Sequence, residues 1–222
     1  MTNPRVTAVV LNWCGEAVTS ECLRSLQVSK YDSLTLLLVD NGSPDDSGER
    51  LRAAFPEVEF LQAGQNLGYA GGNNRGIQWS LERGADYVLI LNNDTVLESD
   101  AIGALVEVAE GEGGKVGGVV PKILCYDEPD RIWYAGGEFS PLRGLGLHWR
   151  EGELDRSYDA EAVQEVTFMT GACLLSAEAL RELNGFDEDF FAYVEDAELS
   201  LRVTGAGFRM VYQPSEIGRA HV

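Results

Sequence analysis

The stretch Tyr87-Val88-Leu89-Ile90-Leu91-Asn92-Asn93-Asp94 joins an apolar run directly to three polar residues. The run shows no alternation between apolar and polar residues, so it is typical of a strand that is buried on both faces of a parallel sheet. A carboxylate at the end of such a strand can hold a metal ion and a phosphate. Taken alone, the three polar residues are more typical of a turn, so their interpretation depends on the rest of the chain.

Three further apolar runs of this kind precede the quoted stretch, at residues 6–11, 34–39 and 58–61. Segments in which apolar residues recur with helical spacing lie between and after the four runs, at residues 17–28, 47–55, 73–83 and 101–109. Strands that alternate with helices in this way predict an α/β fold with a Rossmann-like, doubly wound and mostly parallel sheet.

Residues 122–166 lose this pattern and contain isolated aromatic rings, among them Trp133, Tyr134, His148 and Trp149. We expect a small antiparallel excursion that walls a substrate site, although the rings could equally cover the edge of the sheet. Beyond it, residues 168–176 and 208–212 are predicted as strands, and residues 177–183 and 194–204 as helices. We interpret Gly185 as a helix C-cap and the neighbouring aromatic residues as core, namely Phe186, Phe190, Phe191 and Tyr193.

The composition limits the classes of protein to which the chain can belong. At 222 residues and 24.2 kDa, with 45% hydrophobic residues, it suits one well-filled domain. Its 36 acidic and 17 basic residues argue against nucleic acid as a partner, and a bound nucleotide would need a metal ion to mask its charge. Four scattered cysteines indicate neither a zinc site nor a disulfide framework. We find no signal peptide and no apolar span, which predicts a cytoplasmic location.

Polar residues end three of the predicted strands: Asn12 follows the first, Asp40 and Asn41 the second, and Asn92, Asn93 and Asp94 the fourth. In open α/β sheets, ligands bind in the crevice beyond the carboxyl ends of the strands, so we expect these residues to converge on one cleft. The glycine- and asparagine-rich stretch at residues 64–76 opens into a helix. Close backbone approach and a helix N-terminus favour anionic oxygens at such a place.

A distant acidic pair, Glu195-Asp196, could take a proton from an attacking hydroxyl group. Taken in order, the motifs of the chain resemble those of a family 2 glycosyltransferase of the GT-A fold, and most closely its bacterial rhamnosyltransferase-like members. The resemblance covers residues 5–214. The motifs are Val9-Val10-Leu11-Asn12, Val39-Asp40-Asn41-Gly42-Ser43, Asn66-Leu67-Gly68 with Asn73-Asn74, Leu91-Asn92-Asn93-Asp94, Thr170-Gly171-Ala172, and Gly185-Phe186-Asp187-Glu188 with Phe191 and Glu195-Asp196.

The resemblance implies inverting transfer of a sugar from a nucleotide diphosphate sugar to a hydroxyl acceptor. Asp40 would hydrogen-bond the base, and Asp94 resembles the last acid of a D-x-D motif that ligates Mg2+ or Mn2+, with Asn92 in place of the first acid. Asp196 would be the general base, and Glu195 a positioning neighbour or an acceptor contact. The residues implied to line the nucleotide sugar are Asn12, Asn41, Asn66, Gly71, Asn74, Asn92 and Asn93.

The same resemblance assigns residues 1–215 to a single GT-A domain, with a nucleotide-sugar half at about residues 1–120 and an acceptor half at about residues 121–215. Relatives continue with an apolar strand and a helical extension, whereas residues 216–222 look like the translation of a sequencing adapter. We therefore expect a non-native tail on a C-terminally truncated chain. The missing part could supply a peripheral contact with the inner face of the membrane. The sequence leaves the oligomeric state open.

The substrates are also left open by the sequence. The donor would be a UDP- or dTDP-sugar, and the resemblance favours dTDP-rhamnose. The acceptor would be a glycan or a lipid-linked glycan of cell-surface polysaccharide biosynthesis. One alternative is a catalytically impaired module that only binds a nucleotide sugar, which Asn92 and the missing tail would explain. Another is a nucleotidyltransferase, but residues 11–15 lack the basic, glycine-rich loop expected after its first strand.

Overall fold

A computed structural model describes residues 3–155 and 162–221. Its strands are β1 (Val6–Asn12), β2 (Leu34–Asp40), β3 (Glu59–Gln62), β4 (Tyr87–Leu91), β5 (Thr95–Leu97), β6 (Val116–Cys125), β7 (Ile132–Tyr134), β8 (Gly137–Ser140), β9 (Leu145–His148), β10 (Gln164–Glu165), β11 (Ala172–Ser176) and β12 (Arg209–Ala220). One mixed sheet has the order β10-β12-β6-β11-β4-β1-β2-β3, with β5 beside β12 and β7 beside β6. Strands β8 and β9 form a separate antiparallel pair.

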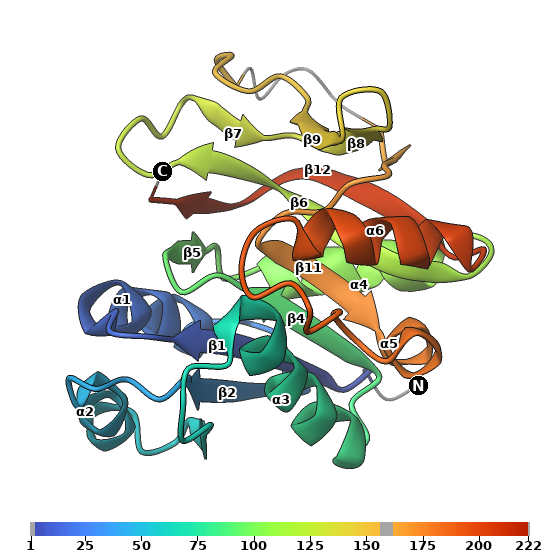
Figure 1. Cartoon of the computed structure of the whole chain (residues 1–222). Coiled ribbons are helices and arrows are strands. Elements are labelled where there is room, and N and C mark those ends of the chain that lie inside the picture. Colours follow the sequence, from blue (N-terminus) through green and yellow to red (C-terminus); the bar gives the residue numbers. More distant parts are fainter. Residues whose placement is uncertain (1–2, 156–161, 222) are drawn as a thin grey trace.

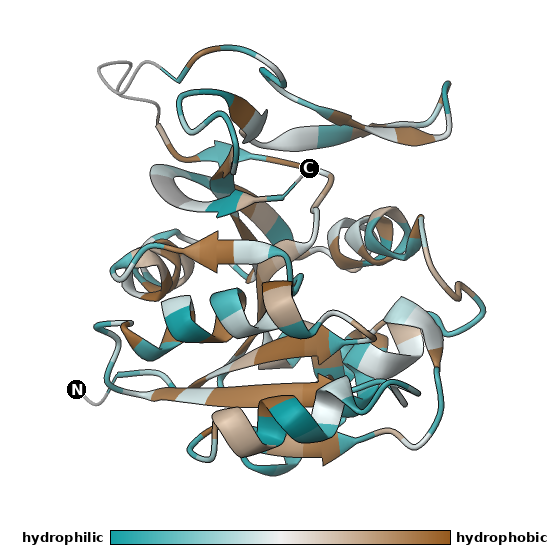
Figure 2. Cartoon of the chain, turned by 90° about the vertical axis from the view of Figure 1, so that its left-hand side faces the viewer, coloured by the Kyte–Doolittle hydropathy of each residue, from teal (hydrophilic) through white to brown (hydrophobic). Residues whose placement is uncertain are grey.

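Helices cover both faces of the sheet. They are α1 (Glu16–Gln27), α2 (Ser47–Ala54), α3 (Gly68–Glu82), α4 (Ala101–Gly111), α5 (Ala177–Leu183) and α6 (Glu195–Gly205). Helices α3, α5 and α6 lie in front of the sheet in Figure 1, and α1 and α4 lie behind it. Figure 2 shows the apolar residues concentrated on the strands between these layers. The arrangement confirms the predicted α/β fold class.

The parallel part of the sheet explains the apolar runs of the sequence. Strand β1 pairs in parallel with β2 and with β4, and β2 pairs in parallel with β3. Consecutive residues are buried here, such as Ala8, Val9 and Val10, because helices pack on both faces. Strand β11 is antiparallel to β4, which places Ala172 opposite Leu91. The start of β11 therefore lies at the carboxyl end of β4.

Helix α3 begins at Gly68, five residues before the predicted start, because asparagine side chains bond its first turn. The Gly68 amide donates to Asn66 Oδ1 at 2.9 Å, and the Leu67 amide donates to Asn41 Oδ1 at 3.0 Å. Glycine is a poor helix former, but Gly72 allows the helix to pack closely on β1, since a Cβ there would lie 2.6 Å from Leu11 Cδ1. Tertiary packing outweighs local propensity in this segment.

Two predicted strands have different bounds in the structure. Residues 168–171 lie outside β11, because their backbone groups bond other elements: Phe168 O accepts from Tyr134 Oη at 2.6 Å, and Met169 N donates to Ser200 Oγ at 3.0 Å. Strand β12 continues past residue 212 to Ala220, and its end pairs with β6 and β5. Residues 216–220 therefore have strand pairing, whereas their non-native origin stays a prediction.

The excursion forms the antiparallel ribbon that the sequence predicts. His148 lies among aromatic rings, with its ring centroid 5.1 Å from that of Tyr134 and 5.8 Å from that of Phe168. A buried ion pair between Lys122 Nζ and Asp155 Oδ1, at 3.0 Å, ties the excursion to β6. Removal of one partner would leave a buried charge uncompensated, so this pair fixes where the excursion lies. In the described part of the chain, we find no helix with the length and apolar character to cross a bilayer.

The close approach of α3 to the sheet gives a stability prediction. At Gly76 a Cβ would overlap a methyl group of the fully buried Val9 and lie 3.3 Å from Val39 Cγ2. We expect Gly76→Ala to lower the free energy of unfolding by about 1–3 kcal/mol, because a well-packed core resists added atoms. The measurement is urea unfolding followed by circular dichroism.

Gly111, at the end of α4, is the matched control because a Cβ there would meet nothing within 4 Å. Gly111→Ala should leave the stability unchanged or raise it by up to about 1 kcal/mol through helix propensity. Equal effects of the two substitutions would contradict the close-packing explanation.

Candidate active site

Asn12, at the end of β1, is the centre of a buried hydrogen-bond network. Its Nδ2 donates to Asp40 Oδ1 at 2.8 Å and to Ser43 Oγ at 3.1 Å. Its Oδ1 accepts from Thr19 Oγ1 at 3.1 Å and from the Gly15 amide at 3.2 Å. Since the side chain is fully buried, it ties β1 to β2 and α1. Its predicted contact with the nucleotide sugar stays a prediction.

Asp40, at the end of β2, has a carboxylate that is stabilised in its charged form. Besides Asn12, the carboxylate accepts from Ser43 Oγ at 2.6 Å and from Gln62 Nε2 at 2.9 Å. Burial raises the pKa of Asp40, but the hydrogen bonds from Ser43, Asn12 and Gln62 outweigh it, so the net pKa lies below its usual value. Asp40 is therefore an ionised acceptor at neutral pH.

Asn41 and Asn66 join the end of β2 to the start of α3. Asn41 Nδ2 donates to Asn66 Oδ1 at 3.1 Å and to Gly68 O at 3.0 Å. Both asparagines also bond amides at the helix entry. The structure thus brings these two predicted residues together at the start of α3, and the binding of anionic oxygens at this helix N-terminus stays a prediction.

The turn after β4 holds its three polar side chains differently. Asn92 Oδ1 accepts from Tyr69 Oη at 2.8 Å, and Asn93 Nδ2 donates to Thr19 Oγ1 at 2.8 Å. The Asp94 carboxylate has only a long contact, 3.4 Å from Thr95 Oγ1, among the side-chain hydrogen bonds of the described residues. Burial raises the pKa of Asp94. A backbone hydrogen bond, Thr95 and a protonated His221 offset this rise only in part, so the net pKa of Asp94 stays above its usual value.

Glu195 and Asp196 form the first turn of α6. Glu195 is 7% exposed, and no described residue hydrogen-bonds its Oε2. Asp196 Oδ1 accepts from the Ala197 amide at 2.7 Å, which leaves Oδ2 for another partner. Burial raises the pKa of both carboxyl groups, and hydrogen bonds from backbone amides oppose the rise at each of them. A carboxylate with a raised pKa and a free oxygen is suited to accept a proton.

Tyr69, in the first turn of α3, contacts the segments that carry the two acidic groups, through Asn92 on one side and Phe191 O on the other. Burial raises the pKa of its hydroxyl most, followed by the charges of Glu195, Asp196 and Asp94. These three carboxylates come from elements about a hundred residues apart in the chain, yet all act on one hydroxyl group. The structure thus brings the predicted metal ligand and the predicted base to one place.

The sequence analysis missed four side chains of this site: Thr19, Ser43, Gln62 and Tyr69. Ser43 and Tyr69 lie inside stretches that the sequence singles out, so their hydrogen-bonding groups could have been considered there. Thr19 and Gln62 carry no such signal, because their roles depend on how α1 and β3 pack beside β1 and β2.

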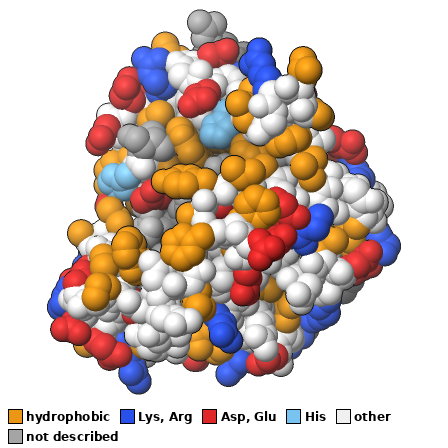
Figure 3. Space-filling model, viewed as in Figure 1, with side chains coloured by type: hydrophobic (Ala, Val, Ile, Leu, Met, Phe, Trp, Pro, Cys, Tyr) orange, Lys and Arg blue, Asp and Glu red, His pale blue; other side chains and the backbone are white. Residues whose placement is uncertain are grey.

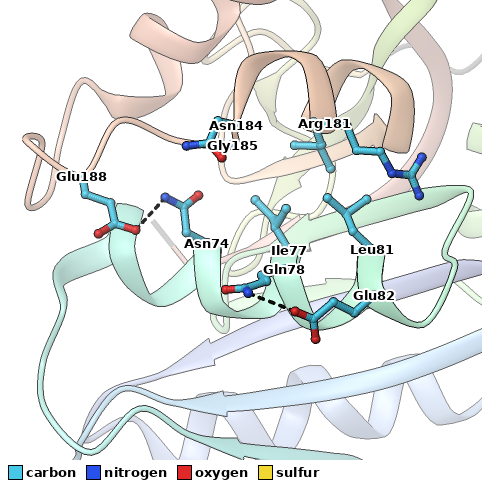
Figure 4. A pocket seen from close by; sticks show the side chains of 10 residues that line it. Asn74, Ile77, Gln78, Leu81, Glu82, Arg181, Asn184, Gly185 and Glu188 are labelled. Atoms are coloured by element: carbon cyan, nitrogen blue, oxygen red, sulfur yellow. Dashed lines mark hydrogen bonds between the residues drawn. The ribbon is translucent and has the colours of Figure 1, made fainter.

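Two further predicted residues lie along α3. Gly71 is buried, and a Cβ there would lie 2.9 Å from Leu67 Cβ. Asn74 joins α3 to the turn before α6, since its Nδ2 donates to Phe186 O at 2.8 Å and to Glu188 Oε1 at 3.0 Å. Asn74 also lines a cavity of about 500 Å3 between α3 and α5 (Figure 4). The other predicted site residues do not line this cavity, so it is distinct from the cluster at the strand ends.

The segment before α6 corrects an interpretation from the sequence. Phe186 is 4% exposed and packs as predicted, but Phe191 is 60% exposed and Tyr193 86% exposed, so these two are not core. Tyr193 and Val194 have φ angles of 70° and 75°, which turn this segment outward. The preceding helix is capped by Asn184, with φ 60°, rather than by Gly185. Figure 3 shows hydrophobic side chains gathered across the centre of this face, with acidic ones beside them.

Asp94 is the candidate ligand for a divalent cation. Among the described residues, no three His, Cys, Asp or Glu side chains come close enough to hold a metal ion by themselves. Asp94 nevertheless suits one position, because its half-buried carboxylate has only the long contact to Thr95 Oγ1 among the side-chain hydrogen bonds of the described residues. Mg2+ is usually bound by one or two carboxylates together with substrate phosphates and water. The residues present therefore fit a cation shared with a diphosphate rather than one held by protein groups alone.

Comparisons with known proteins agree with this geometry. Residues 8–183 match the model of the family described as glycosyl transferase family 2. An N-acetylglucosaminyl-diphospho-decaprenol L-rhamnosyltransferase of Mycobacterium tuberculosis is 31% identical over 87% of the chain, which spans 68% of that relative. An N-acetylglucosaminyltransferase of Rhizobium leguminosarum is 31% identical over 96% of the chain, which spans 48% of it.

A solved structure shows the same fold. The mannosyltransferase PcManGT of Pyrobaculum calidifontis, in complex with GDP-Man and Mn2+, superposes with a TM-score of 0.70 and 18% identity, over 100% of this chain and 58% of that one. The likeness confirms the GT-A fold. The chain covers only part of each of these proteins.

The opposite pKa shifts of Asp40 and Asp196 give a prediction for stability. The folded-state pKa of Asp40 is lowered, so its charged form stabilises the fold above its unfolded pKa, and this is lost as the pH falls through the folded pKa. The folded-state pKa of Asp196 is raised, so its charged form costs stability once the pH has risen through that value. At pH 7, we expect Asp40→Asn to lower the melting temperature and Asp196→Asn to raise it.

Thermal unfolding from pH 7 down to about pH 3, where free carboxyl groups become protonated, checks this prediction. Both differences from the wild-type protein should shrink as the pH falls. Two substitutions that shift the melting temperature in the same direction at pH 7 would show that one of the assigned directions is wrong.

Proposed function

Because this chain belongs to glycosyl transferase family 2, we propose that it transfers a sugar from a nucleotide diphosphate sugar to a hydroxyl group of a glycan acceptor, with inversion at the anomeric carbon. The observation that carries the proposal is the link through Tyr69, which bonds Asn92 in the turn that ends in Asp94 and bonds Phe191 O in the segment that leads to Glu195 and Asp196. The Asp94 carboxylate suits a cation that binds the diphosphate, and the Asp196 carboxylate suits the proton of the acceptor hydroxyl group. The family match leaves no support for the nucleotidyltransferase alternative.

The donor side of the proposal uses the strand ends. Asp94 would hold Mg2+ or Mn2+ together with the diphosphate, and the bound cation would offset the charge that grows on the leaving group. Asp40, kept ionised by its hydrogen bonds, would accept a hydrogen bond from the base. Asn41, Asn66 and the start of α3 would lie along the nucleotide sugar. The Mn2+ in the structurally similar mannosyltransferase supports this cation.

The acceptor side of the proposal uses α6. Asp196 would accept the hydroxyl proton on Oδ2 as the acceptor oxygen attacks, because Oδ1 already bonds the Ala197 amide. A raised pKa brings a carboxylate closer to the working pH and makes it a better base, and such a base typically contributes about 10²–10⁴-fold in rate. Glu195, with its unpartnered Oε2, would position the acceptor.

The substrates follow from the relatives and stay proposals. The Mycobacterium tuberculosis relative supports L-rhamnose, carried as dTDP-rhamnose, and a lipid-linked glycan acceptor of cell-surface polysaccharide biosynthesis. The Rhizobium relative supports N-acetylglucosamine from a UDP-sugar instead. We assign residues 1–120 to the donor half and residues 121–215 to the acceptor half.

One observation favours a second candidate, a module that binds a nucleotide sugar with little turnover. Asn92 stands where a second acid would assist the metal, and its oxygen is already bonded to Tyr69. Metal affinity would then rest on Asp94 alone among the protein groups after β4. Donor turnover above that of a metal-free control separates the two candidates.

The first test is calorimetric titration of the wild-type chain with UDP and dTDP, with and without Mn2+. We expect Mn2+-dependent binding of one nucleotide, and a loss of at least about tenfold in affinity for Asp94→Ala, because the cation loses its carboxylate ligand. Asp196→Asn should bind the nucleotide as the wild type does and slow transfer by about a hundredfold or more.

Folding of each variant is checked by circular dichroism. No nucleotide binding by a folded wild-type chain would overturn the transferase proposal, as would full Mn2+-dependent binding by Asp94→Ala.

A further inference from the structure

Tyr69 connects the turn after β4 to the segment before α6. Its hydroxyl group donates to Asn92 Oδ1 at 2.8 Å, and its backbone amide donates to Phe191 O at 2.6 Å. The edge of its ring also faces Phe186, with the ring centroids 6.0 Å apart. The backbone of Gly68, the preceding residue, lies so close to Phe191 that a side chain at 68 would overlap Phe191 O. These contacts leave Tyr69 little freedom to turn away from Asn92.

Asn92 is held on three sides. Tyr69 occupies its Oδ1, and its backbone amide donates to Gly171 O at 2.7 Å. The side chain lies against Gly171, where a Cβ would overlap the Asn92 amide group. Within the described residues we find no hydrogen bond from Asn92 Nδ2. The amide is thus fixed with its oxygen bonded and its nitrogen available.

We propose that Tyr69 is a positioning residue that turns position 92 from a potential metal ligand into a hydrogen-bond donor for an oxygen of the sugar nucleotide. The hydroxyl of Tyr69 takes the amide oxygen, so the Nδ2 group is left for a diphosphate oxygen or a sugar hydroxyl oxygen. At position 92 a neutral amide, which donates a hydrogen bond, stands in place of a second carboxylate. Position 92 therefore attracts the sugar nucleotide without attracting the cation. This inference rests on the proposed function and adds how Asn92 acts in it.

Four variants test the inference, each titrated with nucleotide at saturating Mn2+, and Asn92→Asp and the wild type are also titrated with Mn2+ at a fixed nucleotide concentration. Tyr69→Phe removes only the hydroxyl that holds the amide, Asn92→Ala removes the amide, and the double variant combines them. Asn92→Asp keeps an acceptor for Tyr69 but replaces Nδ2 with an oxygen. Tyr87→Phe is the matched control, because Tyr87, at the opposite end of β4, loses a comparable hydrogen bond, 2.5 Å to Glu110 Oε1.

The ligands are UDP with UDP-GlcNAc, or dTDP with dTDP-rhamnose, whichever nucleotide the wild type binds. We expect Tyr69→Phe and Asn92→Ala each to weaken binding of the sugar nucleotide by about fivefold, the effect of one hydrogen bond. The double variant should be no weaker than Asn92→Ala alone, and Tyr87→Phe should match the wild type. Weaker binding of both ligands assigns Nδ2 to the diphosphate, and weaker binding of the sugar nucleotide alone assigns it to the sugar.

Asn92→Asp tests whether position 92 acts as a hydrogen-bond donor or as a metal ligand. The inference expects weaker binding of the sugar nucleotide and no fall in the Mn2+ concentration for half-saturation, because the new oxygen repels what Nδ2 attracts. Tighter Mn2+ binding with an unchanged or improved donor affinity would show that position 92 serves the metal and would overturn the inference.

Two other outcomes separate this inference from the proposed function. If the wild type binds nucleotide through Asp94 while Tyr69→Phe and Asn92→Ala bind as tightly as the wild type, the inference alone fails. If the folded wild-type chain binds no nucleotide at all, the proposed function fails and the inference fails with it.

Discussion

The antiparallel pairing of β11 with β4 is the constraint on which the rest of the site depends. Because the two strands run in opposite directions, the start of β11 meets the end of β4, and the Asn92 amide donates to Gly171 O. The chain then continues through α5 and returns along the front of the sheet to the start of α6. A parallel strand in the same place would bring its carboxyl end, and not its start, to the turn that carries Asp94.

The acids of the site differ in what surrounds them. Asp40 receives enough hydrogen bonds to offset its burial, whereas the buried Glu195 and the half-buried Asp94 and Asp196 have fewer partners. Burial without compensation costs free energy, which a bound ligand or a proton can relieve. The three acids proposed to act on the cation and the acceptor therefore differ from Asp40 in their hydrogen bonds and not in the chemistry of their carboxyl groups.

The sequence predicted the parts of the fold that hydrophobic pattern controls. The four apolar runs became β1 to β4; burial on both faces explains the lack of alternation in β1 and β4, whereas β3 lies at the edge of the sheet and has no buried residue. The polar strand ends were also predictable, although their functional roles remain predictions. What could not be predicted depends on contacts between distant segments: the early start of α3 needs the side chains of Asn41 and Asn66, and the exposure of Phe191 and Tyr193 follows from an outward turn that no local pattern signals.

The excursion between β6 and β11 leaves the sheet and returns without entering the parallel β4-β1-β2-β3 ladder. Its anchor to β6, the Lys122–Asp155 ion pair, lies on the far side of β11 from that ladder, and its rings surround His148, which is near enough to Asp196 for a protonated imidazole to lower the pKa of that carboxyl. Insertions or deletions in the excursion would therefore reshape the wall beside Asp196 without shifting the register of the strands that end in Asn12, Asp40 and Asp94. Evolution is free to diversify one half of such a domain while it preserves the other, which makes the architecture modular within a single fold.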